Sequence, residues 1–137
     1  MIKANTPQEQ VVLDFFTTLN TGDLEKIRGT LHADATWRPM VDGVPGAGVH
    51  GPRDYIVDKF LGPVRGLFEP GDPKNVVDRI ASSGDLVMCE SRGSGTLLDG
   101  RKYNNRYCWS IDLRDGKVFV IREYMDSHYV VTLFGAG

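Results

Sequence analysis

Charged side chains interrupt apolar strands in the last third of the chain, and their spacing predicts a site. Leu86 and Met88 lie two residues apart, and Glu90 and Arg92 continue the same alternation. Further along, Glu123 follows alternating apolar residues in a second predicted strand. Because alternate residues of a strand share one face, we expect these three charged residues to face an apolar interior. A buried charge is costly unless it is paired, so the pattern predicts either a functional site or a structural ion network.

Glu123 is the best candidate for acid–base catalysis. Burial in an apolar pocket raises the pKa of a carboxyl group, whereas a neighbouring arginine lowers it, so proton donation and proton acceptance both stay open at this stage. Arg92 cannot act as a base; we expect it to orient Glu90 and Glu123 or to bind an oxyanion or carboxylate. The alternative for Glu123 is one half of a structural ion pair with Arg92.

Aromatic residues and a methionine are expected around these charges. Tyr107 is predicted to lie between Arg92 and Glu123, where it either donates a hydrogen bond to substrate or packs across the strands. Trp37, Trp109 and Met125 are expected to line the pocket and contact substrate. For the two tryptophans the alternative is an ordinary role in the aromatic core, of which a pocket wall is a special case.

The histidines and the glycine-rich segments give weaker indications of a functional site. His50 lies between glycines, and we expect it at the pocket mouth as a proton shuttle; the alternative is a surface or capping role. His32 and His128 have no chelating spacing with His50, so no metal site is predicted. No phosphate-binding glycine motif follows a predicted strand, and no cofactor is expected.

The turns of the C-terminal strands decide which side chains meet. A two-residue turn at Asp99-Gly100 would pair Arg92 with Tyr107 and Glu90 with Trp109. The next turn, at residues 114–116, is expected to have three residues with Gly116 left-handed, because odd-numbered apolar residues must face each other there. That register places Tyr107 opposite Glu123 and completes one charged row across three strands.

The rest of the chain supplies the elements that position this row. Thr6 and Pro7 read as the N-cap and first residue of a helix, and Asp126 as the N-cap either of the C-terminal helix or of the turn before it. Apolar spacing and turn signals predict helices at residues 7–20, 24–32, 53–68 (bent at Gly62-Pro63) and 127–134. They also predict strands at 35–40, 74–82, 104–113 and 118–126, a further strand that begins at Leu86, and a loop at 41–52. Pro39 restricts the first strand to an edge or an end of the sheet.

Composition narrows the possible partners. The 137 residues are 41% hydrophobic and 25% charged with a net charge of −2, which predicts one domain spanning residues 1–137. There is no basic block, so nucleic acid is not an expected partner. The chain has no apolar run of membrane-spanning length and no apolar signal-peptide core, so we expect a cytoplasmic location and no membrane association. Cys89 and Cys108 are expected to be reduced.

The order of elements is that of the cone-shaped fold of nuclear transport factor two. The segment DGRKYNNRYCWSIDLRDGKVFVIREYMDSHY resembles the SnoaL-like, ketosteroid isomerase-related branch of that superfamily. The resemblance implies an α+β fold, nuclear transport factor two-like or cystatin-like, in which a curved antiparallel sheet packs on N-terminal helices around an apolar pocket. It also implies a homodimer through the outer sheet face, where we expect the small residues Ser91, Gly93, Cys108 and Ser110.

The resemblance also implies a range of activities, because this fold is shared by isomerases, cyclases, dehydratases, hydrolases and adaptors. We therefore expect a cofactor-independent acid–base enzyme acting on a small hydrophobic metabolite; the alternative is a non-catalytic ligand-binding or adaptor domain. Limonene epoxide hydrolases carry an Asp-Arg-Asp triad, which Glu90, Arg92 and Glu123 resemble with the arginine and the first acid exchanged. The general base of ketosteroid isomerases falls near Pro39.

Overall fold

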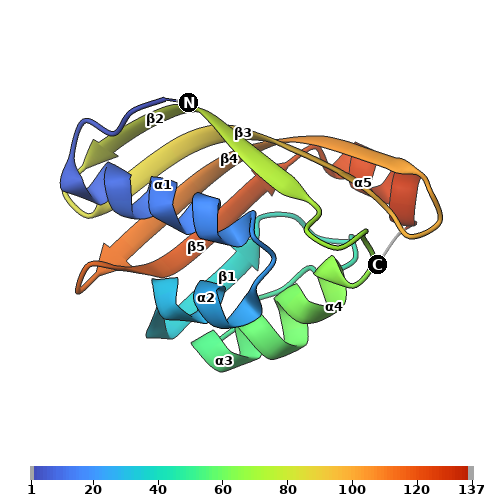
Figure 1. Ribbon diagram of the computed structural model, residues 1–137, viewed down its shortest axis with the longest axis horizontal. Helices are drawn as coiled ribbons and strands as arrows, with labels where there is room; N and C mark the ends of the chain where they lie inside the picture. The colour runs from blue at the N-terminus through green and yellow to red at the C-terminus, as the bar shows by residue number, and fades with distance from the viewer. Residues whose placement is uncertain (1, 136–137) are drawn as a thin grey trace.

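The computed structural model describes residues 2–135 as one curved sheet with helices on its open side (Figure 1). The strands are β1 (Leu31–Pro39), β2 (Lys74–Ser83), β3 (Leu86–Thr96), β4 (Lys102–Arg114) and β5 (Lys117–Met125). The helices are α1 (Pro7–Leu19), α2 (Leu24–Thr30), α3 (Arg53–Tyr55), the π-helical η1 (Ile56–Leu61), α4 (Gly62–Arg65) and α5 (Ser127–Phe134). The strand order is β1-β5-β4-β3-β2, and all pairs are antiparallel except β1 with β5.

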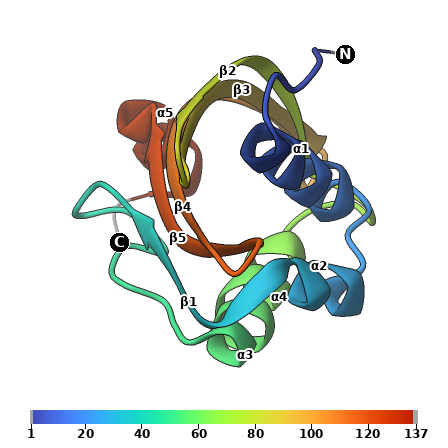
Figure 2. The ribbon, with the colours of Figure 1, turned by 90° about the vertical axis from the view of Figure 1, so that its left-hand side faces the viewer.

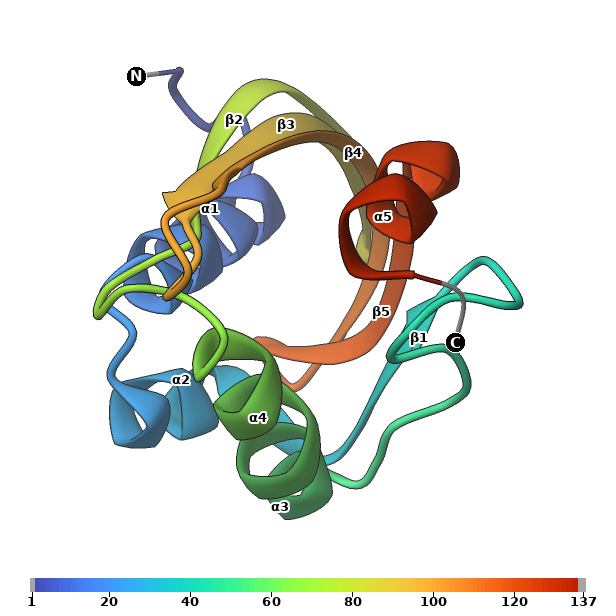
Figure 3. The same ribbon diagram turned by 90° about the vertical axis from the view of Figure 1, so that its right-hand side faces the viewer.

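The sheet curls strongly around one interior. Figures 2 and 3 look along it from opposite sides and show α1, α2 and α4 facing the concave side, with α5 beside β4 and β5. One apolar core joins α1 and the bent helix to the inner sheet face, with Phe15, Ile56, Trp109 and Ile121 among its fully buried members. The predicted α+β cone is therefore confirmed. No helix within residues 2–135 is long and apolar enough to span a membrane.

Side-chain caps begin the two helices whose starts the sequence predicts. The Thr6 hydroxyl accepts a hydrogen bond from the Glu9 backbone N–H at 3.1 Å, and Pro7 occupies the first helical position. The buried Glu9 carboxylate in turn accepts hydrogen bonds from Asn5 N–H and the Ser82 hydroxyl, which tie the start of α1 to β2. At α5, Asp126 accepts from the Tyr129 N–H at 3.1 Å. Both predicted N-caps are confirmed.

The helix expected to bend at Gly62-Pro63 remains continuous through a π-helical turn. Proline has no N–H and its ring clashes with the carbonyl four residues earlier, so an α-helical ladder cannot continue through Pro63. The preceding segment widens instead, and the N–H of Gly62 bonds to the carbonyl of Val57, five residues back. This bend turns α4 and its last residue, Arg65, toward the start of β2.

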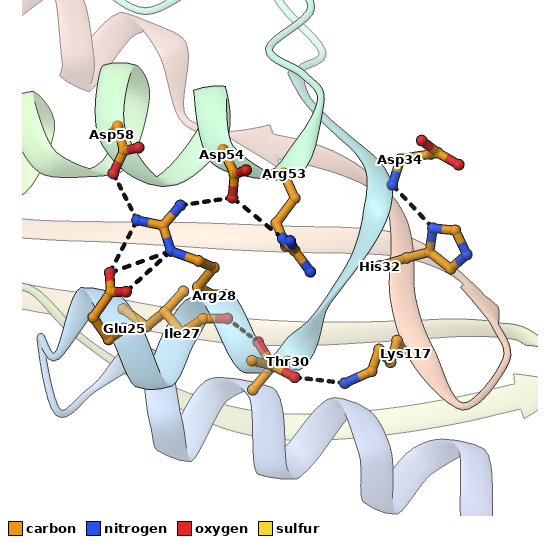
Figure 4. Close-up of polar contacts among 11 residues, drawn as sticks. Glu25, Ile27, Arg28, Thr30, His32, Asp34, Arg53, Asp54, Asp58 and Lys117 are labelled. Carbon is orange, nitrogen blue, oxygen red and sulfur yellow. Dashed lines mark hydrogen bonds and ion pairs between the residues drawn. The ribbon is translucent and has the colours of Figure 1, made fainter.

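An ion cluster fixes this bent helix against α2 (Figure 4). The guanidinium of Arg28 contacts Asp54 and Asp58, each at 2.7 Å, and Glu25 at 2.9 Å. The three carboxylates are largely exposed, so each contact contributes little stability. Their joint effect is positional, because one guanidinium joins two helices that both border the interior.

The turn between β3 and β4 is one residue longer than expected. The N–H of Leu97 bonds to the carbonyl of Arg101, which leaves a three-residue turn ending at Gly100 with φ of 89°. In the resulting register Ser91, not Arg92, pairs with Tyr107. A shift of one residue moves every side chain of a strand to the opposite face. The expected pairing of these two strands is therefore wrong.

The turn between β4 and β5 is one residue shorter than expected. Asp115 and Gly116 form a two-residue turn with φ of 53° and 71°, as primed turns require. A bulge at Phe119 compensates, so odd-numbered residues still face each other. Glu123 therefore pairs with Trp109, and the expected partner Tyr107 pairs with Met125. The predicted face of Glu123 is correct, although its neighbour is not.

Candidate functional site

The expected charged row does not form, because β3 presents its acid and its arginine to the outer face. The Arg92 side chain is 64% exposed and makes a two-pronged contact with Asp78 at 2.8 Å. The Glu90 side chain is 59% exposed, and its nearest cation is Arg79 at 3.8 Å. Neither residue lies in the interior with Glu123, so their expected place in the site is wrong. The cause is the longer turn after β3.

Glu123 stands inside the cone without either expected partner. Its Oε1 accepts a hydrogen bond of 2.8 Å from the indole Nε1 of Trp37, which lies on the neighbouring strand β1. Burial raises the pKa of Glu123 to about 7, and the Trp37 hydrogen bond opposes this rise. Within residues 2–135, no cationic side chain forms an ion pair with Glu123. The carboxyl group is therefore poised between its two protonation states near neutral pH.

Two adjoining cavities meet at Glu123. The larger, of about 170 Å³, is bordered by the loop at 41–52, the bent helix and α5, and its walls are mostly apolar. The smaller, of about 90 Å³, extends from there toward the end of α1 and the start of β2. The residues that line both cavities are Phe60, Val64, Pro73, Tyr107 and Glu123. A ligand in either cavity would thus meet this carboxyl group.

Two tyrosine hydroxyls accompany Glu123 in the larger cavity. Tyr103 and Tyr107 both line it, and their hydroxyl groups form a hydrogen bond with each other. The side-chain amide of Asn105 donates to the Tyr103 hydroxyl at 3.1 Å. Burial raises the pKa of both tyrosines above its ordinary value, so both remain protonated at neutral pH. One hydroxyl uses its proton in the bond between them, so the pair can donate one hydrogen bond to a ligand oxygen.

The remaining apolar candidates also lie in the cavity walls. Trp37 and Trp109 line the smaller cavity and pack edge to face, with ring centroids 5.7 Å apart. Met125 lines the larger cavity. The structure thus brings Trp37, Trp109, Met125 and Tyr107 together around Glu123, as the sequence predicts.

His50 lies outside both cavities and contacts the residues that form their walls. Its backbone pairs with that of Trp37 through two hydrogen bonds of 2.8 and 2.9 Å. Its ring stacks on Phe60 with centroids 4.0 Å apart, and its Nε2 contacts the carbonyl of Gly46 at 2.6 Å. His50 is not a lining residue of either cavity, so the expected position at the mouth is wrong. It instead holds the glycine-rich loop against Trp37.

Sequence reasoning missed three polar residues that line the cavities. Tyr103 lies four residues before Tyr107 on the same strand and the same face, and this spacing is a signal that could have found it. Arg65 and Asn75 line the smaller cavity from α4 and from the start of β2. No local pattern marks them, because the bend at Pro63 and the curl of the sheet bring them to the cavity. Residues 2–135 contain no group of three His, Cys, Asp or Glu side chains suited to a metal ion.

Comparison with solved structures places this geometry in a known fold. The protein TerC, crystallised with polyporic acid, matches with 21% identity, 93% coverage of this chain, 99% of that chain and a TM-score of 0.78. An NTF2-like protein of unknown function from Burkholderia pseudomallei K96243 matches with 17% identity, 93% and 97% coverage and a TM-score of 0.81. An LEH-like epoxide hydrolase from M. tuberculosis matches with 16% identity, 92% and 87% coverage and a TM-score of 0.75. At these identities the likeness shows the fold.

Comparison at the sequence level identifies the family. No curated protein sequence matches the chain significantly. The sequence model of the SnoaL-like domain matches residues 12–121, which run from within α1 to the first half of β5 and include most of the cavity-lining residues, but not Glu123. The chain therefore belongs to the SnoaL-like domain family and has the NTF2-like fold expected from its sequence.

Proposed function

We propose that this protein is a cofactor-independent acid–base enzyme that acts on a small, largely apolar molecule, with Glu123 as the proton-transferring group. One observation carries the proposal: a carboxyl group without a cationic partner among residues 2–135 lines two largely apolar cavities and has a pKa of about 7. A general acid or base works best when its pKa lies near the working pH. The proposed reaction is of the isomerase, cyclase or dehydratase kind.

The proposed mechanism divides the work among neighbouring groups. The hydrogen bond from Trp37 holds one oxygen of Glu123, and the second oxygen takes a proton from ligand carbon or returns it. The hydrogen-bonded pair of Tyr103 and Tyr107 donates its one free hydroxyl proton to an oxygen on which negative charge develops. Trp109 and Met125 form apolar walls that exclude water. Epoxide opening by the expected acid–arginine–acid triad is disfavoured, because Glu90 and Arg92 lie on the outer face.

Structures of the same fold support a small-molecule ligand. TerC was crystallised with polyporic acid, and a protein with a ketosteroid isomerase-like fold from Catenulispora acidiphila is in complex with trimethylamine. These ligands belong to those proteins, and their chemistry differs widely. They support the proposal that the cavity of this chain also takes a small molecule, without naming it.

A generic carbon acid tests the proposal without knowledge of the natural substrate. In nitrobenzisoxazole, a base takes the ring C–H proton, the N–O bond breaks, and a coloured cyanonitrophenolate forms. We expect the protein to accelerate this reaction with a rate that rises as pH passes through about 7, as Glu123 ionises. Glu123→Gln should lower kcat/KM by about 100-fold or more, because an amide cannot accept the proton.

Glu90→Gln is the matched control for this experiment. It makes the same chemical change on the outer face, where the carboxylate is mostly exposed, and should leave the rate unchanged. Equal rates for wild type and Glu123→Gln would contradict the proposal and favour the alternative, a non-catalytic ligand-binding or adaptor domain. Unfolding midpoints of both variants, measured in urea, show whether any loss of rate is a loss of folded protein.

We also propose a homodimer through the outer sheet face. Val76, Leu86, Met88 and Tyr124 are exposed there, and Cys108 and Ser110 leave room for close approach. The other small residues expected on this face, Ser91 and Gly93, are buried on the inner face instead. Light scattering should give a dimer mass for wild type and a monomer mass for Met88→Glu. A cytoplasmic location and the lack of a cofactor stay predictions.

A further inference from the structure

We propose that Arg65 and Asn75 form a subsite for an anionic oxygen, so that the ligand is a small ring compound bearing a carboxylate or a comparable acidic oxygen. The subsite lies in the smaller cavity, whose wall also includes Tyr107 and Glu123. This inference rests on the proposed function in that it assigns a substrate class to the same cavity. It makes a separate claim, however, because binding at Arg65 does not require catalysis at Glu123.

Arg65 is a half-buried cation at the cavity; the nearby carboxylate of Asp72 attracts it and opposes the lowering of its pKa by burial. Its Nη2 makes two long hydrogen bonds, 3.4 Å to the carbonyl of Gly71 and 3.3 Å to that of Pro73. Within residues 2–135 no carboxylate forms an ion pair with it, and its other guanidinium nitrogens have no hydrogen-bond partner. The planar guanidinium therefore keeps donors in the geometry that suits a carboxylate.

Asn75 is held in one orientation by its neighbours. Asn20, at the end of α1, bonds to its backbone N–H and carbonyl, each at 2.7 Å. The Trp109 indole donates to the Ser91 hydroxyl at 2.8 Å, and Ser91 then donates its single proton to Oδ1 of Asn75 at 3.1 Å. These contacts fix the side-chain oxygen of Asn75 against the inner face of β3. The amide Nδ2 is left to point elsewhere.

The amide Nδ2 of Asn75 is a donor that a ligand can use. It has no hydrogen-bond partner among residues 2–135, where no fully buried side-chain nitrogen or oxygen lacks a partner. Nδ2 is therefore accessible rather than sealed in the core. Asn75 lines the smaller cavity together with Arg65, and it also borders a second hollow beside Asn20. Asn75 and Arg65 thus offer neutral and charged donors to the same space.

Charge within the cavity restricts where an anion can bind. Arg65 does not contribute to the pKa of Glu123, which depends on burial and on Trp37, so the two charged groups act separately. An anionic group beside ionised Glu123 would be repelled, whereas beside Arg65 it would be attracted. The apolar body of such a ligand would then extend along Trp37 and Trp109 toward the carboxyl group. This arrangement favours a ligand with one acidic end and one apolar, reactive end.

A pair of isosteric probes tests the subsite. 2-Naphthoate and 2-naphthamide share one ring system and differ in charge, and quenching of tryptophan fluorescence measures their binding near Trp37 and Trp109. We expect wild type to bind the carboxylate at least about tenfold more tightly than the amide. Arg65→Met should weaken naphthoate binding by about 10- to 100-fold and leave naphthamide binding within about twofold. Arg65→Lys keeps the charge and should lose less.

Arg79→Met is the matched control, because Arg79 is an exposed arginine of the outer face and its loss should change neither affinity. The proposal is overturned if wild type binds neither probe, if it binds both equally, or if Arg65→Met weakens both equally. The comparison of probes on wild type needs no variant to fold. Preference for naphthoate should persist in Glu123→Gln. If wild type prefers naphthoate but does not accelerate proton transfer from nitrobenzisoxazole, the subsite stands and the proposed enzyme activity fails.

Discussion

The two faces of the sheet carry the same kinds of residue in opposite environments. On the outer face, Arg92 pairs with Asp78 and Glu90 lies near Arg79, and all four side chains are at least 40% exposed. On the inner face, Glu123 has one hydrogen bond from Trp37 and no ion pair within residues 2–135. Water and counterions support the outer charges, whereas the inner carboxyl group bears the cost of burial.

This contrast between the two faces gives a physical reason for the proposed role of Glu123. A carboxylate beside an arginine has a lowered pKa, as Asp78 has beside Arg92, and is a poor acid or base at neutral pH. Glu123 has no such partner within residues 2–135 and burial raises its pKa, which is why we propose it as the acid or base.

The dependence of stability on pH should show the cost of burying Glu123. The pKa of its carboxyl is about 7 in the folded protein and about 4.3 in the unfolded chain, so the folded state binds more protons between these values. The contribution of Glu123 to the free energy of unfolding therefore falls as pH rises through this window, by up to about 3 kcal/mol. Glu123→Gln lacks this fall. Its free energy of unfolding, measured in urea, should therefore rise relative to that of wild type between pH 5 and pH 8.

Glu90→Gln provides the comparison from the outer face, and its difference from wild type should stay nearly constant over the same pH range. A constant difference for Glu123→Gln would instead show that its carboxyl group is ionised throughout, and the comparison of the two faces would then fail.

A substitution at Gly93 tests which residues of β3 face the interior. A Cβ added to Gly93 would lie 2.7 Å from Cε2 of Tyr107, so Gly93→Ala should lower the free energy of unfolding by about 1–3 kcal/mol. Ser94→Ala, one residue along on the exposed face, should change it by less than about 0.5 kcal/mol. Equal small effects would mean that Gly93 does not face the aromatic interior.

The sequence predicts the fold better than the site, because helix starts depend on local signals and strand faces depend on register. Helix starts depend on local signals such as Thr6-Pro7 and Asp126, and both N-caps are confirmed. The faces of β3 depend instead on the length of one turn, and the choice at Asp99-Gly100 was wrong by one residue. Glu123 was placed on the correct face because odd-numbered apolar residues had to meet across β4 and β5, whichever turn joined them.

The small residues of β3 held the signal that would have corrected the register. Ser91 and Gly93 were read as an outer surface suited to a partner sheet. They are small because Trp109, Tyr107 and Asn75 fill the space above them on the inner face. A single sequence cannot distinguish these causes, since close packing on either face selects small residues. The roles of Arg65 and Asn75 could not be predicted from the sequence, because only the bend at Pro63 and the curl of the sheet bring them to the cavity.

The hydrogen bond from Trp37 should set the pKa of Glu123 within the inner site. Trp37→Phe removes a donor that favours the ionised form, so the pKa should rise above about 7, by about one unit. The pH–rate curve for nitrobenzisoxazole should move to higher pH by the same amount. Trp109→Phe also removes an indole from the cavity wall, but its donor bonds to Ser91, so the curve should keep its position. Equal shifts in both variants would assign the effect to packing.

The smallest effect is expected at the outer pair of Arg92 and Asp78. A double-mutant cycle with Arg92→Met and Asp78→Asn should give a coupling energy below about 1 kcal/mol, because both side chains are exposed and solvent screens their attraction. That coupling should shrink further when salt is raised from 0.1 M to about 1 M, where the Debye length falls to about 3 Å. A larger, salt-independent coupling would mean that another protein surface covers the pair. Such a result would sharpen the proposed dimer, since a second copy on this face would remove the solvent that now screens these charges.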